Sequence, residues 1–427
     1  MSSADIYRRR VVDDELDDLL QDLPAVSLDG PKGVGKTATA SVRAKSVFAL
    51  DRPRTLELVL ADPDRLTAAP EPVLIDEWQR YLPSWDLVRR QVDLDNHPAR
   101  FLLTGSASPT SPQTHTGAAR IVSLRMRPLA LAERGLVAPT VSLGGLLAGT
   151  HGPIVGASPL TLEGYVSQIV RGGFPGMNAR STKNQRALLA SYIKLIVDRD
   201  FPEAGSPVRN PTALRRWLTA YAAASGTTAT YETIRDASTA GSENPPPRST
   251  TIPYRDTLER IWISDPVPAW APSHNRLARL TGNPKHFLAD PALAVALLNL
   301  DEDTLLSGRE IGPPIPRRGS QLGALFESLV ALDVRVYAQA AEAHVGHLRT
   351  KSGAREVDLV VTGLGNRTLA IEVKLSATVS DGDVRHLLWL KDQLGPDLVD
   401  MVIVTTGTDA YRRTDGVAVV PAALLGP

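Results

Sequence analysis

The chain has 427 residues, 43% of them hydrophobic and 22% charged, with equal numbers of acidic and basic side chains. At roughly 100 to 200 residues per domain, this length predicts two or three domains, each with a core of its own. The zero net charge excludes a protein that is basic over its whole surface, so any contact with DNA must be local. The absence of cysteine excludes disulfides, thiolate metal sites and thiol nucleophiles.

The first residues of the chain are charged rather than apolar, as in "MSSADIYRRRVVDDELDDLL". A secretory signal needs an apolar stretch at this point, and no apolar run in the chain approaches the ~18 residues of a membrane span. We therefore expect a cytoplasmic protein that does not contact a membrane.

Residues 1–150 are predicted to form an α/β domain. Four short apolar runs are each followed by polar or glycine-rich residues and then by a helical pattern. Such runs are typical of buried parallel strands in a sheet that is covered on both faces. The runs are "AVSLDG", "TLELVLAD", "PVLIDEW" and "ARFLLTGSA".

A glycine loop, "GPKGVGKT", follows the first run and precedes a predicted helix, so it satisfies G-x-x-x-x-G-K-[ST] in its expected setting. The glycines let backbone N–H groups surround phosphates, Lys36 reaches the β and γ phosphates, and Thr37 binds Mg²⁺. The alternative is an ordinary turn with a solvated lysine, which the acids that follow disfavour. We expect ATP and Mg²⁺ as cofactors, with a nucleotide-binding set of Gly30, Pro31, Lys32, Gly33, Val34, Gly35, Lys36, Thr37 and Ala38.

The third run ends in two acids, Asp76 and Glu77. Carboxylates at the C-terminal end of a buried strand are costly unless they serve a cation or a water molecule. Asp76 therefore suits the Mg²⁺ site, and Glu77 suits activation of the attacking water. The fourth run ends in Thr104 and Ser106, whose hydroxyls would sense the γ-phosphate or its water. For each of these side chains the alternative is a cap on the next helix.

Two arginines are candidates for stabilising the γ-phosphate. Arg120 lies in "HTGAARI" and Arg171 lies in "VRGGFP". Either side chain would act in its own subunit or in a neighbouring one. Since P-loop proteins commonly complete the site with a neighbour's arginine, we expect a homo-oligomer with Arg120 in that role.

Residues 151–318 are predicted to be mainly helical. Leu188, Leu189, Tyr192 and Ile196 recur at helix spacing. The stretch "DASTAGSENPPPRSTTIP" has hardly an apolar residue and is rich in Ser, Pro, Gly and Thr, which predicts a flexible loop.

The stretch from "ALRRWLTAYAAAS" through "TATYETIRDAS" to "TIPYRDTLERIWISDPVPAW" resembles a winged helix. In that arrangement Arg215, Arg216 and Arg235 would face the phosphates of DNA. The alternative is that these arginines only solvate the surface or link domains.

Residues 319–427 are predicted to be α/β again. A helix, "QLGALFESLVALDVRVYAQAA", precedes the strands "REVDLVV", "TLAIEVK" and "DMVIVTT". Because residues two apart on a strand point the same way, Glu372 and Lys374 should share one face, with Val373 opposite in the core.

The joint order of these motifs, from the glycine loop through "LIDEWQ", "LLTGSAS", "RGGFP" and "LGALFESLV" to "REVDLVV" and "AIEVK", resembles a prokaryotic family of AAA-type ATP-binding proteins. That family carries a C-terminal domain related to restriction endonucleases. The resemblance runs over nearly the whole chain. It implies a P-loop AAA+ domain with a parallel sheet, a helical and winged-helix-like middle, and a nuclease-like α/β domain of the PD-(D/E)xK type at the end.

The resemblance also implies a second metal site. In nucleases of that type, an acid on one strand and the E-x-K pair on the next hold a divalent ion, and the lysine positions or activates water. The corresponding residues here are Asp358, Glu372 and Lys374, with Glu327 on the preceding helix as a further ligand. The alternative is a domain that kept its fold after losing catalysis, in which Lys374 and Arg355 neutralise the acids.

These observations predict an Mg²⁺-dependent ATPase whose nucleotide state controls a nuclease-like domain that acts on or binds DNA. A nucleotide-switched regulator, which binds a partner and cleaves nothing, is the alternative function.

Overall fold

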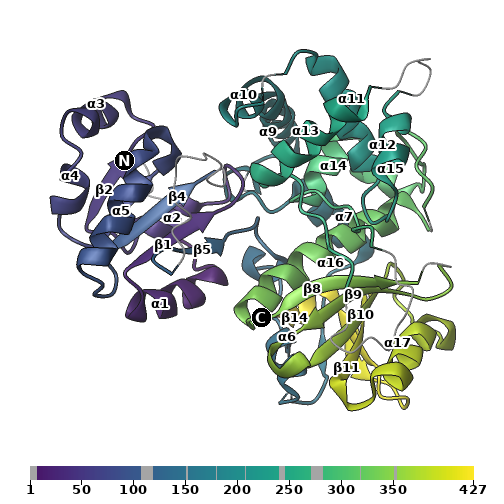
Figure 1. Cartoon of the computed structure of the whole chain (residues 1–427). Helices are drawn as coiled ribbons and strands as arrows, with labels where there is room; N and C mark the ends of the chain where they lie inside the picture. Colours follow the sequence, from purple (N-terminus) through teal and green to yellow (C-terminus); the bar gives the residue numbers. More distant parts are fainter. Residues whose placement is uncertain are drawn as a thin grey trace. The chain divides into compact units, whose positions relative to one another are not determined.

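The computed structural model describes residues 7–106, 119–150, 152–178, 180–206, 208–239, 246–270, 282–317, 319–350 and 353–427. The chain divides into two compact units (Figure 1). Unit 1 comprises residues 1–127, 174–176 and 260–262. Unit 2 comprises residues 128–173, 177–259 and 263–427. Residues 128–150, which the sequence pattern groups with the first domain, thus cluster with unit 2.

Within its described residues, unit 1 contains one five-stranded sheet in the order β2-β3-β4-β1-β5, and every neighbouring pair is parallel. The all-parallel arrangement confirms the α/β prediction for this segment. The strands are β1 (Ala25–Asp29), β2 (Ser46–Ala49), β3 (Val73–Asp76), β4 (Phe101–Gly105) and β5 (Val122–Arg125).

One predicted strand of unit 1 is wrong. The run "TLELVLAD" lies in helix α3 (Pro53–Ala61), and the strand at this point of the chain is β2 instead. The run buries only Val59 fully, while Leu58 and Leu60 are exposed, so it is a surface helix rather than a core strand. Leucine, glutamate and alanine favour a helix, and Pro53 fits its first turn.

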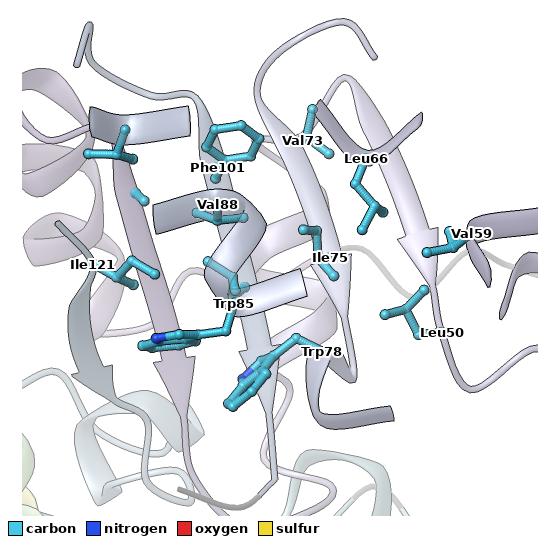
Figure 2. Close-up of a cluster of buried hydrophobic side chains, with 13 residues drawn as sticks. Leu50, Val59, Leu66, Val73, Ile75, Trp78, Trp85, Val88, Phe101 and Ile121 are labelled. Carbon is cyan, nitrogen blue, oxygen red and sulfur yellow. The ribbon is translucent and has the colours of Figure 1, made fainter. Parts of the chain in front are cut away.

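The helices of unit 1 pack around a core rich in aromatic side chains (Figure 2). Trp78 and Trp85 are almost completely buried, and their ring centroids are 4.8 Å apart. They pack with Ile75 and Phe101 of neighbouring strands, so they join helix to sheet directly beside the end of β3. The helices are α1 (Val12–Asp22), α2 (Lys36–Ser41), α3, α4 (Arg65–Ala68), the 3₁₀ helix η1 (Trp78–Tyr81) and α5 (Pro83–Leu94).

The described part of unit 2 contains a seven-stranded mixed sheet in the order β7-β12-β13-β11-β10-β9-β8. β10 is antiparallel to β9 and parallel to β11. A short parallel pair joins β6 (Val141–Ser142) to β14 (Leu425–Gly426). The sheet strands are β7 (Gly156–Ala157), β8 (His344–Arg349), β9 (Glu356–Thr362), β10 (Thr368–Lys374), β11 (Leu398–Thr405), β12 (Asp409–Arg412) and β13 (Ala418–Pro421).

Two long helices pack on this sheet. α16 (Gln321–Ala340) begins where the sequence predicts it, with the Ser320 side chain accepting a hydrogen bond from the Gly323 N–H as an N-cap. α17 (Asp381–Leu394) buries Val384, Leu387 and Leu390 in a hydrophobic cluster with strand residues. No helix among the described residues is both long enough and apolar enough to cross a membrane.

The middle of the chain is helical, as predicted, and belongs to unit 2 except for residues 174–176 and 260–262. After α13, the segments around Ser264–Val267 and Lys285–Leu288 form isolated antiparallel bridges. The helices are α6 (Leu143–Ala148), α7 (Leu162–Arg171), α9 (Thr182–Leu195), the π-helical η3 (Ile196–Asp200), α10 (Phe201–Glu203), α11 (Pro211–Ala223), α12 (Tyr231–Ala237), α13 (Arg248–Arg260), α14 (Pro291–Leu297) and α15 (Glu302–Leu306).

The predicted loop "DASTAGSENPPPRSTTIP" is corrected at both ends. Its first two residues close α12, and residues 248–253 form the first half of α13. Thr251 and Tyr254 are buried there, so tertiary packing stabilises a helix that the polar composition does not favour. Residues 240–245 of the predicted loop lie outside the described residues.

Candidate functional site

The glycine loop runs from β1 to α2, and the whole predicted set, residues 30–38, lies in this loop and the first turn of α2. Gly30 approaches another backbone closely, since a Cβ there would lie 2.1 Å from the Met126 carbonyl oxygen. Gly35 has φ of 102°, which strains any residue with a side chain. The glycines at these two positions are therefore required by the shape of the loop.

Lys36 is folded back onto the loop that precedes it. Its Nζ donates hydrogen bonds to the carbonyl oxygens of Gly30 at 2.7 Å and Pro31 at 2.9 Å. Burial lowers the pKa of Lys36 to about 8, although the nearby carboxylates of Glu77, Asp29 and Asp76 oppose the shift. The loop thus holds an ammonium group that is largely removed from water.

Asp76, the last residue of β3, collects two hydroxyl groups. Its Oδ1 accepts hydrogen bonds from Thr37 Oγ1 at 2.7 Å and from Thr104 Oγ1. Thr37 lies in the first turn of α2 and Thr104 lies near the end of β4, so three elements meet at one carboxylate at the C-terminal edge of the sheet. Carboxylate and hydroxyl oxygens are hard ligands, and this set fits Mg²⁺.

Glu77 has φ of 55° and ψ of 46°, a left-handed conformation that is uncommon for a residue with a side chain. Gln79 Nε2 donates a hydrogen bond to Glu77 Oε2 and another, at 3.2 Å, to Ser106 Oγ. Ser106 Oγ lies 3.4 Å from Glu77 Oε2. The structure thus brings Glu77 and Ser106 together, with Gln79 as a positioning residue that the sequence pattern does not single out.

Arg10 is a second residue of unit 1 that sequence reasoning misses. Its Nη1 donates a hydrogen bond to the Val34 carbonyl oxygen of the glycine loop, and its Nη2 donates to the carbonyl oxygen of Arg127, both at 2.9 Å. The only signal in the sequence is the basic run "YRRR". Arg10 therefore joins the N-terminal segment to the loop.

Four of the predicted arginines have polar partners close to them in the chain or on its surface. Arg120 Nε pairs with Asp93 at 2.8 Å, and both side chains are exposed. Arg171 Nε donates to Ser167 Oγ within α7. Arg215 and Arg235 pair with Asp198 and Asp236, respectively. Contact of Arg120 or Arg171 with a phosphate, and of Arg215, Arg216 or Arg235 with DNA, stays a prediction.

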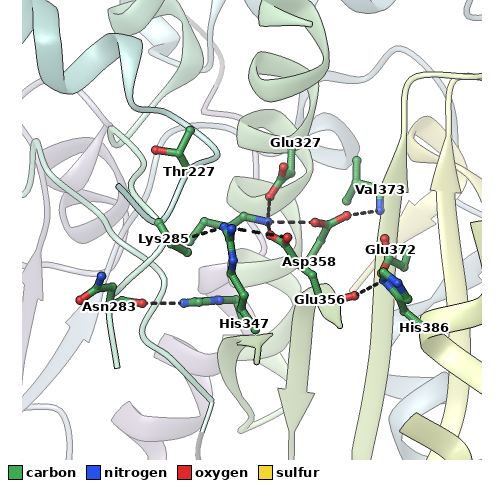
Figure 3. A network of polar contacts seen from close by, with 12 residues as sticks. Thr227, Asn283, Lys285, Glu327, His347, Glu356, Asp358, Glu372, Val373 and His386 are labelled. Atoms are coloured by element: carbon green, nitrogen blue, oxygen red, sulfur yellow. Dashed lines mark hydrogen bonds and ion pairs between the residues drawn. The ribbon is translucent and has the colours of Figure 1, made fainter. Parts of the chain in front are cut away.

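In unit 2 two acids of the predicted nuclease-like site, Glu327 and Asp358, contact a lysine (Figure 3). Lys285 Nζ lies 2.5 Å from Glu327 Oε1, 2.9 Å from Asp358 Oδ1 and 3.7 Å from Glu356 Oε1. Glu327 comes from α16, Asp358 from β9, and Lys285 from the middle segment. Sequence reasoning misses the role of Lys285, which lies in the stretch "PKHFLADPALAVAL".

Glu372 lies on β10 beside this cluster. Lys374 Nζ is 3.2 Å from Glu372 Oε2, which places both side chains on one face as predicted, and His386 Nδ1 is 3.8 Å from Glu372 Oε1. The prediction that Val373 lies in the core is wrong, because Val373 is only partly buried and lines a cavity, whereas Glu372 is buried. Near the end of β10, polar side chains rather than an apolar layer cover the face that carries Glu372.

Arg355, which the sequence suggested as a neutralising charge, packs on an aromatic ring. Its guanidinium lies over the ring of Trp389, 5.5 Å from the ring centroid. Lys285 is the positive charge that pairs with Glu327 and Asp358. Its side chain comes from the middle segment of the chain and not from β9 or β10.

The charges of the cluster are unequally distributed. Burial disfavours ionisation of Asp358, but Lys285, Lys374 and the Val373 N–H together lower its pKa to about 2. Burial raises the pKa of Glu327 to about 8 against the opposing effect of Lys285. Burial and the Asp358 charge raise the pKa of Glu372 well above its usual range. Asp358 is therefore the acid of this cluster whose ionised form is favoured most strongly.

This arrangement does not fit a divalent metal ion. The Lys285 ammonium occupies the space between Glu327 and Asp358. In the described part of the chain, no group of three or more His, Cys, Asp or Glu side chains is arranged to hold a metal. A cavity of about 800 Å³ lies beside the cluster and is lined by Lys285, Glu327, Asp358, Glu372 and Lys374, among other residues.

Comparison with known families gives three matches. Residues 22–134 match a family model described as an AAA domain. Residues 162–304 and 322–425 match two models described as domains of unknown function, DUF8612 and DUF4143. The AAA-type domain predicted from the glycine loop is thus confirmed at the level of the family, and this match supports ATP binding by unit 1.

Similar whole proteins were also found. The chain is 28% identical to the uncharacterized proteins Mb2031c of Mycobacterium bovis and Rv2008c of Mycobacterium tuberculosis, over 98% of this chain and 85% of each relative. The Walker-type ATPase PABY2304 of Pyrococcus abyssi aligns with 69% of this chain and 97% of its own, with 14% identity and a TM-score of 0.41. The winged-helix and nuclease-like assignments stay predictions.

Proposed function

We propose that unit 1 binds ATP with Mg²⁺ and hydrolyses it. The observation that carries this proposal is the convergence on Asp76 of Thr37 from the glycine loop and Thr104 from β4, with the backbone-strained Glu77 as the next residue. Strained conformations of this kind persist where the surrounding structure maintains them, and they concentrate at functional sites.

Each side chain has a separate task in this proposal. Lys36 exchanges its two loop carbonyl partners for phosphate oxygens, and Thr37 and Asp76 hold the Mg²⁺. Bound Mg²⁺ would neutralise charge that develops on the phosphates. Glu77, oriented by Gln79 and Ser106, accepts a hydrogen bond from the attacking water.

Magnesium dependence tests this function directly. We expect phosphate release from ATP to require Mg²⁺, to stop when EDTA is added, and to fall about tenfold or more in Asp76→Asn, because the variant loses the charge that binds the ion. Asp62→Asn, on the exposed end of α3, is the matched control and should keep wild-type turnover. Equal turnover in Asp76→Asn and Asp62→Asn would contradict the assignment.

The pKa of Lys36 predicts how ATP binding varies with pH. Above about pH 8 the free protein loses the Lys36 proton, whereas the bound phosphates require the ammonium form. Binding must then take up a proton, so ATP affinity should be constant from pH 6.5 to 8 and fall by up to about tenfold per pH unit above that. Titrations of Kd against pH check this, and Lys45→Gln, which changes an exposed lysine just before β2, should keep the same profile. A flat profile up to pH 9.5 would count against a buried, proton-binding Lys36.

For unit 2 we propose the regulatory alternative, in which the nucleotide state of unit 1 changes how unit 2 binds a partner and no strand is cleaved. The contact of Lys285 with Glu327 and Asp358 supports it, because the ammonium occupies the position that metal-dependent cleavage would need for its ion. DNA is the partner class to test first, given the winged-helix-like pattern. DNA cleavage that requires Mg²⁺ or Mn²⁺ and disappears in Asp358→Ala would contradict this proposal.

A further inference from the structure

The acid cluster of unit 2 is built around a fixed cation. The Lys285 side chain is only 2% exposed, and the side chains of Glu327 and Asp358 are each 14% exposed. Burying a charged lysine is very unfavourable unless its charge is compensated and its N–H groups are hydrogen-bonded. Two carboxylates within 2.9 Å, and a third at 3.7 Å, meet that requirement.

The backbone on both sides of Lys285 is also held. Its N–H and its carbonyl oxygen both bond to Val267, each at 2.9 Å. The neighbouring His286 bonds through its ring to the Ala229 carbonyl oxygen at 2.8 Å, and His347 bonds to the Asn283 carbonyl oxygen at 2.9 Å. Lys285 therefore does not behave as a surface side chain that meets the acids by chance. The bridge between Lys285 and Val267, together with the neighbouring hydrogen bonds, fixes the position of the ammonium.

A divalent ion bound to Glu327 and Asp358 would have to share this point. Mg²⁺ needs oxygen ligands at about 2.1 Å and binds through one or two carboxylates with water completing its shell. The Lys285 ammonium already occupies the space between the two carboxylates, and its charge repels a second cation. The cavity of about 800 Å³ beside the cluster leaves the carboxylates within reach of ions from solvent. Ions can therefore reach the two carboxylates, but the Lys285 ammonium occupies the position that an ion would take.

We infer that Lys285 is an intramolecular substitute for a divalent metal ion, and that Glu327 and Asp358 form a latent divalent-cation site that is available only when the ammonium is removed. The inference concerns unit 2 alone. It stands whether or not unit 1 hydrolyses ATP.

Binding of Mn²⁺ to the full-length protein without nucleotide tests the inference. The wild type should bind no Mn²⁺ through Asp358, so Asp358→Asn should leave the number of bound ions unchanged. Lys285→Met should bind one additional Mn²⁺. The same ion should raise the melting temperature of the variant by about 5 to 10 °C at a concentration 100-fold above Kd, because an ion that binds only the native state stabilises it.

Two further variants complete the test. Lys285→Met with Asp358→Asn should lose the additional ion. Lys374→Met is the matched control, because the Lys374 ammonium pairs with Glu372 and does not lie between Glu327 and Asp358, so its removal should add no Mn²⁺.

The expected loss of a buried ion pair makes Lys285→Met less stable in EDTA, and the variant must fold for its Mn²⁺ binding to be measured. If Lys285→Met folds neither in EDTA nor in Mn²⁺, the double variant Lys285→Met with Glu327→Gln takes its place. This double variant removes one carboxylate together with the ammonium, and it should bind Mn²⁺ through Asp358, but more weakly. Wild-type Mn²⁺ binding that depends on Asp358 would overturn the inference. So would folded lysine variants that gain no ion.

Discussion

Replacing Glu77 by glutamine is expected to lower ATP turnover by about 100-fold or more while ATP still binds. The substitution removes the carboxylate proposed to accept the proton of the attacking water, a contribution typical of a general base. Gln79 and Ser106 keep hydrogen-bonding partners in the amide of the new side chain, so the turn after β3 should hold its shape. Phosphate release and the Kd for ATP, measured side by side, separate turnover from binding.

Lys36→Ala, in contrast to Glu77→Gln, should weaken the binding of ATP itself. It removes the ammonium proposed to bind the phosphates, so the Kd for ATP should rise by about 10- to 100-fold, as expected for the loss of a hydrogen bond from a charged donor. Glu57→Gln, an exposed acid of α3, serves as a control with wild-type values. Wild-type turnover in Glu77→Gln would show that the hydrolytic role belongs to another residue.

Trp85→Ala is expected to destabilise unit 1 by about 3 to 5 kcal/mol, the usual loss when a large aromatic core residue is truncated. Trp85 is 2% exposed, and its ring packs at a tilt against the ring of Trp78. Trp78 directly follows Glu77 in the chain, so the cavity left by Trp85→Ala would lie beside the proposed catalytic turn. The free energy of unfolding, measured with denaturant on the full-length chain, checks this value in the transition assigned to unit 1.

The same helix offers a control for Trp85. Leu94, the last residue of α5, is 79% exposed, and its replacement by alanine should change the free energy of unfolding by no more than about 0.5 kcal/mol. If Trp85→Ala were as stable as Leu94→Ala, the tryptophan pair would not be the core that the structure shows.

The site of unit 1 was predictable because most of its parts are local. Residues 30–37 form one contiguous segment, and Asp76, Glu77 and Thr104 each end a recognisable apolar run. Parallel strands bring their carboxyl ends to one edge of the sheet. The ends of β1, β3 and β4, recognised separately in the sequence, therefore predict one site in space. Gln79 and Arg10 escaped prediction because their roles depend on side-chain hydrogen bonds that follow no spacing rule.

In unit 2 the elements were predicted better than their surroundings. α16 and the strands of Asp358 and Glu372 appear where their patterns indicate. The helix α13 did not follow from its polar sequence, because its stability comes from burying Thr251 and Tyr254. The burial of Glu372 beneath polar neighbours likewise did not follow from strand alternation alone.

The sequence by itself determined the AAA-type nucleotide loop, the acids at the strand ends and the presence of an E-x-K pair on a strand of the last α/β segment. These features rest on short segments whose backbone geometry and side-chain order are enough to define the chemistry. Only the tertiary structure decided which cation the acids of unit 2 meet. Lys285 lies 73 residues before Asp358 in the chain, and no pattern links them. A buried carboxylate that stays ionised needs a positive charge close to it in space, and packing of the middle segment against β9 and α16 made that charge Lys285.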